Sequence, residues 1–251
     1  MVATRSSDKP KRPASARRHA FVTKTTGGLT EFETAHLFGS RAAYGKDDQA
    51  ERSLFRNGWV HDHDHSTKET NVFHKGRHTM VAFRGSKSMT DWVRTDRRIL
   101  ANQEMDQDER FVRSLSEAAD VFAAYPNQKH SYTGHSLGGT IAHFVHRAMD
   151  GNAAVAFNPG TSPLPTSGMR TAMLRTAKNA SKDYGQHTPK QIAAKSVTHH
   201  ILGDPFSAQS EHSFPGSQFK QHQVALKHGH EVGHTLPNFQ GHFHPTFVQA
   251  E

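Results

Sequence analysis

The stretch Tyr132-Thr-Gly-His-Ser-Leu-Gly-Gly139 constrains the fold of this chain more than any other segment. Residues 130–133 read as a short strand, and the residues after Ser136 have the spacing of a helix. A sharp turn between strand and helix needs small residues on either side, because the two backbones approach closely there, and Gly134 and Gly138 meet that need. The pattern predicts a nucleophile elbow with Ser136 as the nucleophile. The apolar positions that form one face of the predicted helix are Leu137, Ile141, Phe144, Val145, Ala148 and Met149.

The predicted helix begins directly after Ser136, so its free N–H groups and partial positive charge point toward the serine. Such a helix end stabilises negative charge that develops on the oxygen of an attacked carbonyl group. The motif therefore indicates acyl-transfer chemistry. The alternative is a glycine-rich helix start that performs no chemistry.

Charge divides the chain into two parts. The 251 residues carry a formal net charge of +8, and residues 1–18 hold six lysines and arginines against one aspartate. Together with its Pro, Ser and Ala content, and without an apolar stretch typical of a signal peptide, this predicts a basic, disordered tail over residues 1–20. The segment Lys9–Pro13 is a candidate contact for polyanions. Residues 21–251 are long and apolar enough for one domain.

Two absences limit the possible classes of protein. The sequence has no cysteine, which excludes disulfides, thiol nucleophiles and cysteine-ligated metals and favours a reducing, intracellular compartment. It also has no run of 18 apolar residues, so we expect a soluble protein without a transmembrane helix.

Predicted strands and helices alternate along the rest of the chain. This alternation predicts an α/β fold with a mainly parallel central sheet flanked by helices. We expect loops from Ser207 onward, where periodicity is weak. The tract His61-Asp-His-Asp-His65 is interpreted as an exposed loop or hairpin tip, with a transition-metal site as the alternative. The expected strands are 79–83, 129–133, 153–157 and 196–202, and the expected helices are 32–44, 106–125, 137–149 and 165–180.

A serine nucleophile needs a histidine base and a carboxylate that orients the base. In α/β-hydrolases the acid follows the serine along the chain, and the histidine follows the acid. Asp204 comes directly after the predicted strand 196–202, whereas Asp150 and Asp183 lie in weaker positions. Spacing alone does not select the base among seven later histidines: His212, His222, His228, His230, His234, His242 and His244.

Four short motifs, in the same order, resemble the class 3 (fungal-type) lipases of the α/β-hydrolase superfamily. They cover roughly residues 30–240, and the pairing of Phe-Arg-Gly-Ser with Gly-His-Ser-Leu-Gly-Gly is the specific part. The motifs are Val81-Ala-Phe-Arg-Gly-Ser86 followed by Trp92, Gly134-His-Ser-Leu-Gly-Gly139, Ala156-Phe-Asn-Pro-Gly160 and Leu202-Gly-Asp-Pro205.

The resemblance implies a serine esterase that cleaves lipid esters such as acylglycerols. It implies Ser136 as nucleophile, Asp204 as acid, and an oxyanion hole formed by Ser86 and the backbone N–H of Leu137. The segment that begins at His234 looks most like the one around the family's catalytic histidine, and His230 and His228 are the next candidates. It further implies transient contact with a lipid interface and no metal or organic cofactor.

Two other functions remain open at this point. His230-Glu231-Val-Gly-His234 matches the H-E-x-x-H pattern of zinc metalloproteases, although Gly229, Gly233 and Pro237 disfavour the helix that this chemistry needs. The third possibility is a binding protein with a degenerate hydrolase fold that docks on nucleic acid or an anionic membrane through its basic tail.

Overall fold

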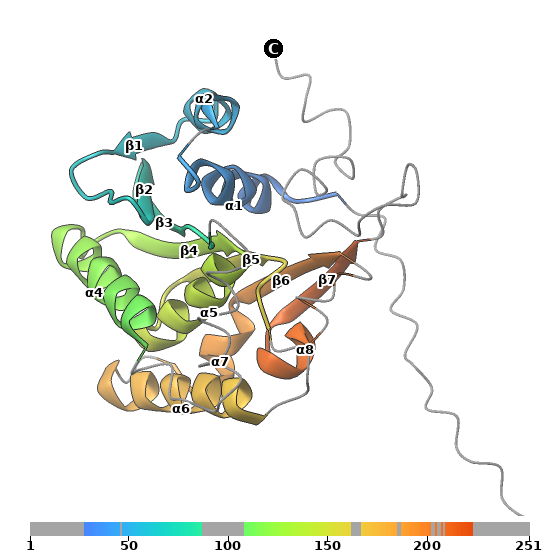
Figure 1. The fold of residues 1–251 in the computed structure, drawn as a ribbon. Coiled ribbons are helices and arrows are strands. Elements are labelled where there is room, and N and C mark those ends of the chain that lie inside the picture. Colours follow the sequence, from blue (N-terminus) through green and yellow to red (C-terminus); the bar gives the residue numbers. More distant parts are fainter. Residues whose placement is uncertain are drawn as a thin grey trace, which may run out of the picture.

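A central sheet with helices packed on both of its faces organises the protein (Figure 1). The computed structural model describes residues 28–45, 47–86, 108–161, 167–184, 187–201, 204, 207 and 209–222. The predicted tail over residues 1–20 lies outside these residues. Within them the helices are α1 (Glu31–Ala42), α2 (Asp48–Arg56), α4 (Glu109–Ala124), α5 (Leu137–Met149), α6 (Ser167–Tyr184), α7 (Pro189–Ala194) and α8 (Ser210–Ser213).

In the described part of the chain the sheet has seven strands in the order β1-β2-β3-β4-β5-β6-β7. The first three strands pair antiparallel, and each pair from β3 to β7 is parallel. The predicted α/β fold with a mainly parallel sheet flanked by helices is confirmed. The strands are β1 (Val60–Asp62), β2 (Thr70–Lys75), β3 (His78–Phe83), β4 (Lys129–His135), β5 (Ala153–Phe157), β6 (Ser196–Ile201) and β7 (Gln218–His222).

Strand β3 is buried on both faces because helices cover the sheet from both sides. Its last four residues, Met80 to Phe83, are fully buried. Val81 and Phe83 pack in a cluster with α4, α5 and α6, whereas Met80 and Ala82 pack in a second cluster with α1 and α2. Figure 1 shows the same division, with α1 and α2 above the sheet and α4 to α8 below it.

Strand β4 is unusually polar for a central strand, and helix α1 matches its polar side chains. His36 Nδ1 donates to the carbonyl oxygen of Phe32, so the other ring nitrogen, Nε2, accepts from the Ser131 hydroxyl at 2.8 Å. Burial lowers the pKa of His36 to about 3, which keeps the ring neutral. One turn later Ser40 Oγ lies 2.8 Å from Thr133 Oγ1. These buried hydroxyls are therefore satisfied by partners, which removes the cost of burying them.

The segment from Ser207 onward is more ordered than the weak periodicity predicts. It forms α8 and the edge strand β7, so the prediction of loops throughout this segment is wrong for residues 210–213 and 218–222. Strand β7 has the sequence Gln-Phe-Lys-Gln-His and is only partly buried, so it lacks the alternating pattern of a half-buried strand. Its backbone pairing with β6 needs no such pattern.

Candidate functional site

Ser136 sits at the turn between the end of β4 and the start of α5. Its backbone has φ 55° and ψ −127°, an unfavourable conformation for a residue with a side chain. Backbone hydrogen bonds to β5 and the loop after it help to hold this conformation: Ser136 N–H donates to Phe157 O at 3.1 Å, and Gly160 N–H donates to Ser136 O at 3.0 Å. The strand, turn and helix thus have the form of a nucleophile elbow.

The elbow closes only because the residues two positions before and after Ser136 are glycines. A Cβ atom on Gly134 would lie 2.2 Å from the carbonyl carbon of Gly138. A Cβ atom on Gly138 would lie 2.1 Å from the carbonyl oxygen of Phe83. Both clashes are with backbone atoms, which do not move aside as a flexible side chain does.

We expect Gly134→Ala to lower the free energy of unfolding by about 3 kcal/mol or more, because this backbone clash adds to ordinary overpacking. Gly76→Ala is the control: a Cβ there meets nothing within 4 Å, and only its φ of +58° is unfavourable. Its cost should be about 1–2 kcal/mol. Chemical denaturation of both variants measures the difference, and equal losses would contradict the close approach at the elbow.

The Ser136 hydroxyl has no hydrogen-bond partner among the described residues. Serine at the N-cap of a helix usually accepts a hydrogen bond from the first turn, but the Ser136 side chain makes no such bond. The residue is 7% exposed, and no described residue hydrogen bonds to its Oγ atom. Leu137 follows it as the first residue of α5, so the Leu137 N–H belongs to the helix end that the sequence predicts as an oxyanion donor.

The predicted second oxyanion residue, Ser86, stands in the turn after β3 and is partly exposed. This turn lies against the elbow, since a Cβ atom on Gly85 would be 2.7 Å from His135 O and 3.4 Å from Ser136 Cβ. Arg84 anchors the turn by donating from Nη1 to the carbonyl oxygen of Lys68 at 2.6 Å. The structure therefore brings the predicted oxyanion turn and the predicted nucleophile together.

Tyr44 joins these two segments and has no counterpart in the sequence-based predictions. Its hydroxyl accepts a hydrogen bond from the backbone N–H of Gly85 and lies 2.9 Å from His135 Nδ1, next to Ser136. Burial raises the pKa of Tyr44, so the phenol stays protonated. No sequence signal identifies Tyr44, because it precedes the elbow by about 90 residues and meets it only in the folded chain.

Asp204, the predicted acid, is almost fully buried (1% exposed) and follows β6 at the carboxyl edge of the sheet. Its backbone N–H donates to Ile201 O at 3.1 Å, and its Oδ2 accepts from the Ser207 hydroxyl at 2.8 Å. Ser136 follows β4 at the same edge, and only β5 lies between the two strands. Two strand spacings amount to roughly 10 Å, a gap that one imidazole ring can bridge.

Asn158, directly after β5, lies between the turn that carries Ser136 and the segment that carries Asp204. Its Oδ1 accepts from Ile201 N–H at 2.8 Å and lies 3.5 Å from Ser207 Oγ, and Ser207 in turn binds Asp204. Asn158 is fully buried and has φ 40°, a conformation that asparagine tolerates better than most residues. The residue before it, Phe157, accepts the backbone hydrogen bond of Ser136.

We expect Asn158→Gly to lower the free energy of unfolding by about 1–3 kcal/mol, because it keeps the backbone conformation but leaves the buried Ile201 N–H without its acceptor. If Asp204 orients the base, kcat for ester hydrolysis should also fall between about 10- and 100-fold through misplacement. Steady-state kinetics and denaturation measure the two effects. The control is Asn57→Gly, at an exposed helix end. Unchanged kcat in Asn158→Gly would contradict the positioning role.

The predicted bases His234, His230 and His228 lie outside the described residues. Among the other candidates, His222 ends β7 and is buried, but its Nε2 lies 2.9 Å from His199 Nδ1. His199 belongs to a network in which Lys220 Nζ donates to Glu33 Oε1 at 2.5 Å. Burial alone would raise the pKa of Glu33, but bonds from His199 and Lys220 hold this pKa far below its usual range. His222 is thus engaged in a structural network.

The tract His61–His65 wraps around its own aspartate instead of forming a metal site. Asp62 Oδ2 lies within 2.9 Å of donors on His65, His74 and Tyr125. Burial alone would raise the pKa of Asp62, but the bonds from His74, Tyr125 and His65 hold it well below its usual range. Over the residues that the structure describes, no group of three or more His, Asp or Glu side chains could hold a metal ion. The H-E-x-x-H motif lies outside them.

The elbow, the predicted oxyanion turn and the predicted acid all lie at one edge of the sheet. A comparison with known protein families identifies the family of the chain. Residues 39–244 match a phospholipase-like family described as the Tle-like phospholipase domain. The chain belongs to this family. The lipase-like resemblance predicted from the sequence motifs is confirmed at this level, and membership supports a lipid ester hydrolase in general.

Other comparisons add less to what is known of this Tle-like phospholipase domain. No curated protein matches the chain. Among solved structures, the native Rhizomucor miehei lipase propeptide complex is 15% identical, with a TM-score of 0.39, over 72% of this chain and 64% of that one. A deletion mutant of the same complex is 13% identical, with a TM-score of 0.41, over 72% and 63%. The chain spans less than two thirds of the length of these lipases.

None of the helices in the described ranges combines the length and the apolar character that crossing a bilayer requires.

Proposed function

We propose that this Tle-like phospholipase domain is a serine hydrolase that cleaves a carboxylic ester bond of a phospholipid, an acylglycerol or a related lipid. The observation that carries the proposal is the position of the Ser136 hydroxyl. It makes no hydrogen bond to a described residue, stands at a strained elbow at the N-terminus of α5, and shares a sheet edge with Asp204. Family membership supports the lipid as the substrate class.

In the proposed reaction Ser136 Oγ forms a bond to the carbonyl carbon while its proton moves to His234. Collapse of the tetrahedral intermediate breaks the ester C–O bond, and the imidazolium gives its proton to the leaving alcohol. Water then attacks the acyl-enzyme, with His234 again as base, and releases the fatty acid. Asp204 holds the imidazole in the required tautomer.

The oxyanion of both tetrahedral intermediates is assigned to the Leu137 N–H and to Ser86. Each such donor contributes about 3 kcal/mol to transition-state stabilisation in enzymes where this has been measured. The fit of Gly85 against Ser136 and the hydrogen bond from Gly85 to Tyr44 support this assignment, because they fix the Ser86 turn relative to the elbow.

Mass spectrometry of the products formed from phospholipid and triacylglycerol vesicles, with and without a chelator, tests the proposal. We expect release of fatty acid that is unchanged by chelation. Loss of hydrolysis on chelation would favour the zinc alternative built on His230, Glu231 and His234. Absence of hydrolysis from every lipid and from soluble esters would favour a binding protein with a degenerate hydrolase fold.

A further inference from the structure

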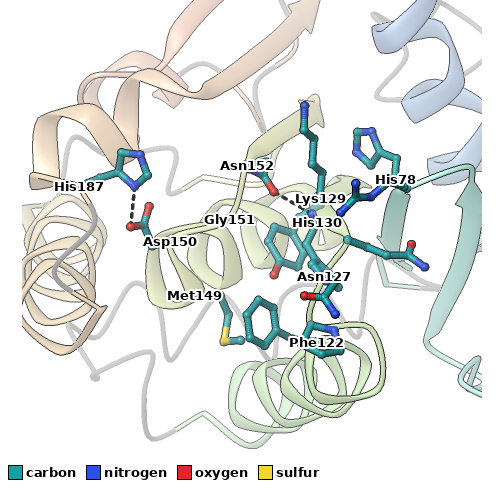
Figure 2. A pocket seen from close by; sticks show the side chains of 14 residues that line it. His78, Phe122, Asn127, Lys129, His130, Met149, Asp150, Gly151, Asn152 and His187 are labelled. Carbon is teal, nitrogen blue, oxygen red and sulfur yellow. Dashed lines mark hydrogen bonds and ion pairs between the residues drawn. The ribbon is translucent and has the colours of Figure 1, made fainter.

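A cavity of about 770 Å³ opens at the edge of the sheet opposite to Ser136 (Figure 2). It is lined by residues where β3, β4 and β5 begin, among them His78, Lys129 and Asn152. Strand β4 runs from this cavity to the elbow, and its seven residues at 3.3 Å each separate the two by roughly 20 Å. A ligand in the cavity would therefore leave the Ser136 edge open.

Two cations border this cavity. Arg77 and Lys129 both line it and are both exposed, and the Lys129 N–H donates to Arg77 O at 2.9 Å, so their backbones are direct neighbours. Neither side chain forms an ion pair with a described residue. Arg77 lies in the turn between β2 and β3, and Lys129 is the first residue of β4. An anion between these two like charges would relieve their repulsion. Burial, Lys129 and His130 together lower the pKa of His78 beside them.

The one carboxylate among the described residues that line the cavity already has partners. Asp150 is its only carboxylate among the described lining residues, and Asp150 Oδ2 lies 2.8 Å from His187 Nδ1, the dashed pair at one end of Figure 2. Lys195 Nζ lies 3.7 Å from the other oxygen of Asp150.

Helices α4 and α5 also end here, and their C-terminal carbonyls would repel an anion if they were open. Two of these carbonyls are occupied by donors. His130 Nε2 donates to Tyr125 O at 2.8 Å, and the Gly151 N–H donates to His146 O at 3.2 Å. These two carbonyls are therefore not open toward an anion in the cavity.

One side of the cavity is apolar. Phe122, Pro126 and Met149 line it, and the His130 ring lies 5.0 Å from the Phe122 ring. Phe122 is 38% exposed, a large aromatic surface left in water. A cavity of this size that combines an apolar wall with a few polar groups at one end is typical of small-molecule sites.

We propose that this cavity binds a single-chain anionic amphiphile, with its head group on Arg77 and Lys129 and its apolar chain along Phe122 and Met149. Arginine and lysine at one end match a carboxylate or a phosphate. Two sources have this chemistry: a fatty acid anion, which lipid ester hydrolysis releases, and a single-chain phosphate ester. The site itself does not depend on the proposed function of Ser136.

Calorimetric titration of the Ser136→Ala protein with decanoate and with decyl phosphate, each below its micelle concentration, tests this proposal. We expect saturable binding of at least one of them, and the tighter of the two identifies the source. Decanol and inorganic phosphate should each bind at least tenfold more weakly, because one lacks the charge and the other lacks the chain. Equal affinity for decanol and the anions would overturn the proposal.

The double variant R77A/K129A should weaken binding at least tenfold, and R77Q/K129Q should do the same. The matched control is K178A/K182A, which removes two exposed lysines from α6. It should change affinity less than twofold.

Phe122→Ala should weaken the binding of decyl phosphate but leave the binding of inorganic phosphate unchanged. Wild-type affinity in R77A/K129A, or an equal loss in the control, would place the ligand elsewhere. Since these experiments use protein without Ser136, their failure is distinct from failure of the proposed hydrolysis.

Discussion

Ser136→Ala is expected to lower kcat for hydrolysis of a short nitrophenyl ester by at least about 10⁴-fold, because it removes the atom that forms the acyl-enzyme. The free energy of unfolding should stay within about 1 kcal/mol of the wild-type value, since the hydroxyl makes no hydrogen bond to the described residues. Steady-state kinetics and chemical denaturation measure the two quantities.

The control for this variant is Ser53→Ala on α2. Ser53 also carries a hydroxyl, which donates to Gln49 O far from the elbow. Its kcat should equal the wild-type value. Activity above about one per cent in Ser136→Ala would assign the nucleophile to another residue, because loss of a triad serine leaves only the contribution of the oxyanion hole and binding.

The second large effect is expected at His234. His234→Ala should lower kcat by about the same factor as Ser136→Ala, because serine and histidine act as one unit. His230→Ala and His228→Ala should keep most of the activity. The three variants are compared by kcat at the same pH, and added imidazole should partly restore the true base variant. A dead His230 or His228 variant beside an active His234 variant would move the base to that residue.

Glu231 separates the serine mechanism from the zinc alternative. In the H-E-x-x-H pattern the glutamate is the general base, so zinc chemistry requires it. The serine mechanism assigns it no role, and Glu231→Gln should therefore leave kcat within about twofold of wild type. A loss comparable with that of His234→Ala would favour the zinc alternative.

The sequence predicts the centre of this fold well because local rules and tertiary packing agree there. Gly134 and Gly138 signal a close approach of backbones, and the structure shows that approach as contacts that any Cβ would violate. The helical spacing after Ser136 matches α5, and the position of Asp204 after a buried strand puts it on the edge that Ser136 shares. These signals are carried by residues close together in the chain.

Features that arise only from long-range contacts could not be predicted in this way. Strand β7 is held by backbone pairing along an edge, so its side chains carry little pattern. Tyr44 follows α1 and contacts His135, which lies 91 residues later in the chain. The Asn158 side chain, at the end of β5, contacts Ile201 and Ser207, which lie more than 40 residues later. The polar character of β4 is explained only once His36 and the rest of α1 are packed on it.

The assignment of the base, by contrast, stays a prediction that depends on His234. Among the histidines that follow Asp204, His222 is a weaker candidate for the base, because it contacts His199 within the Glu33 network. The structure also explains why the large number of histidines is no guide to metal binding or catalysis. His36, His143, His146 and His199 are fully buried, and burial lowers the pKa of each. These histidines serve as neutral packing and hydrogen-bonding groups.

Labelling with a fluorophosphonate probe, followed by peptide mass spectrometry, tests the central claim most directly. The probe bonds covalently only to a serine whose hydroxyl is activated by a neighbouring base. We predict stoichiometric phosphonylation of Ser136, with hydrolysis lost in parallel, and no labelling of the His234→Ala protein on the same timescale. Active protein in which Ser136 stays unmodified, or label on a different serine, would contradict the account.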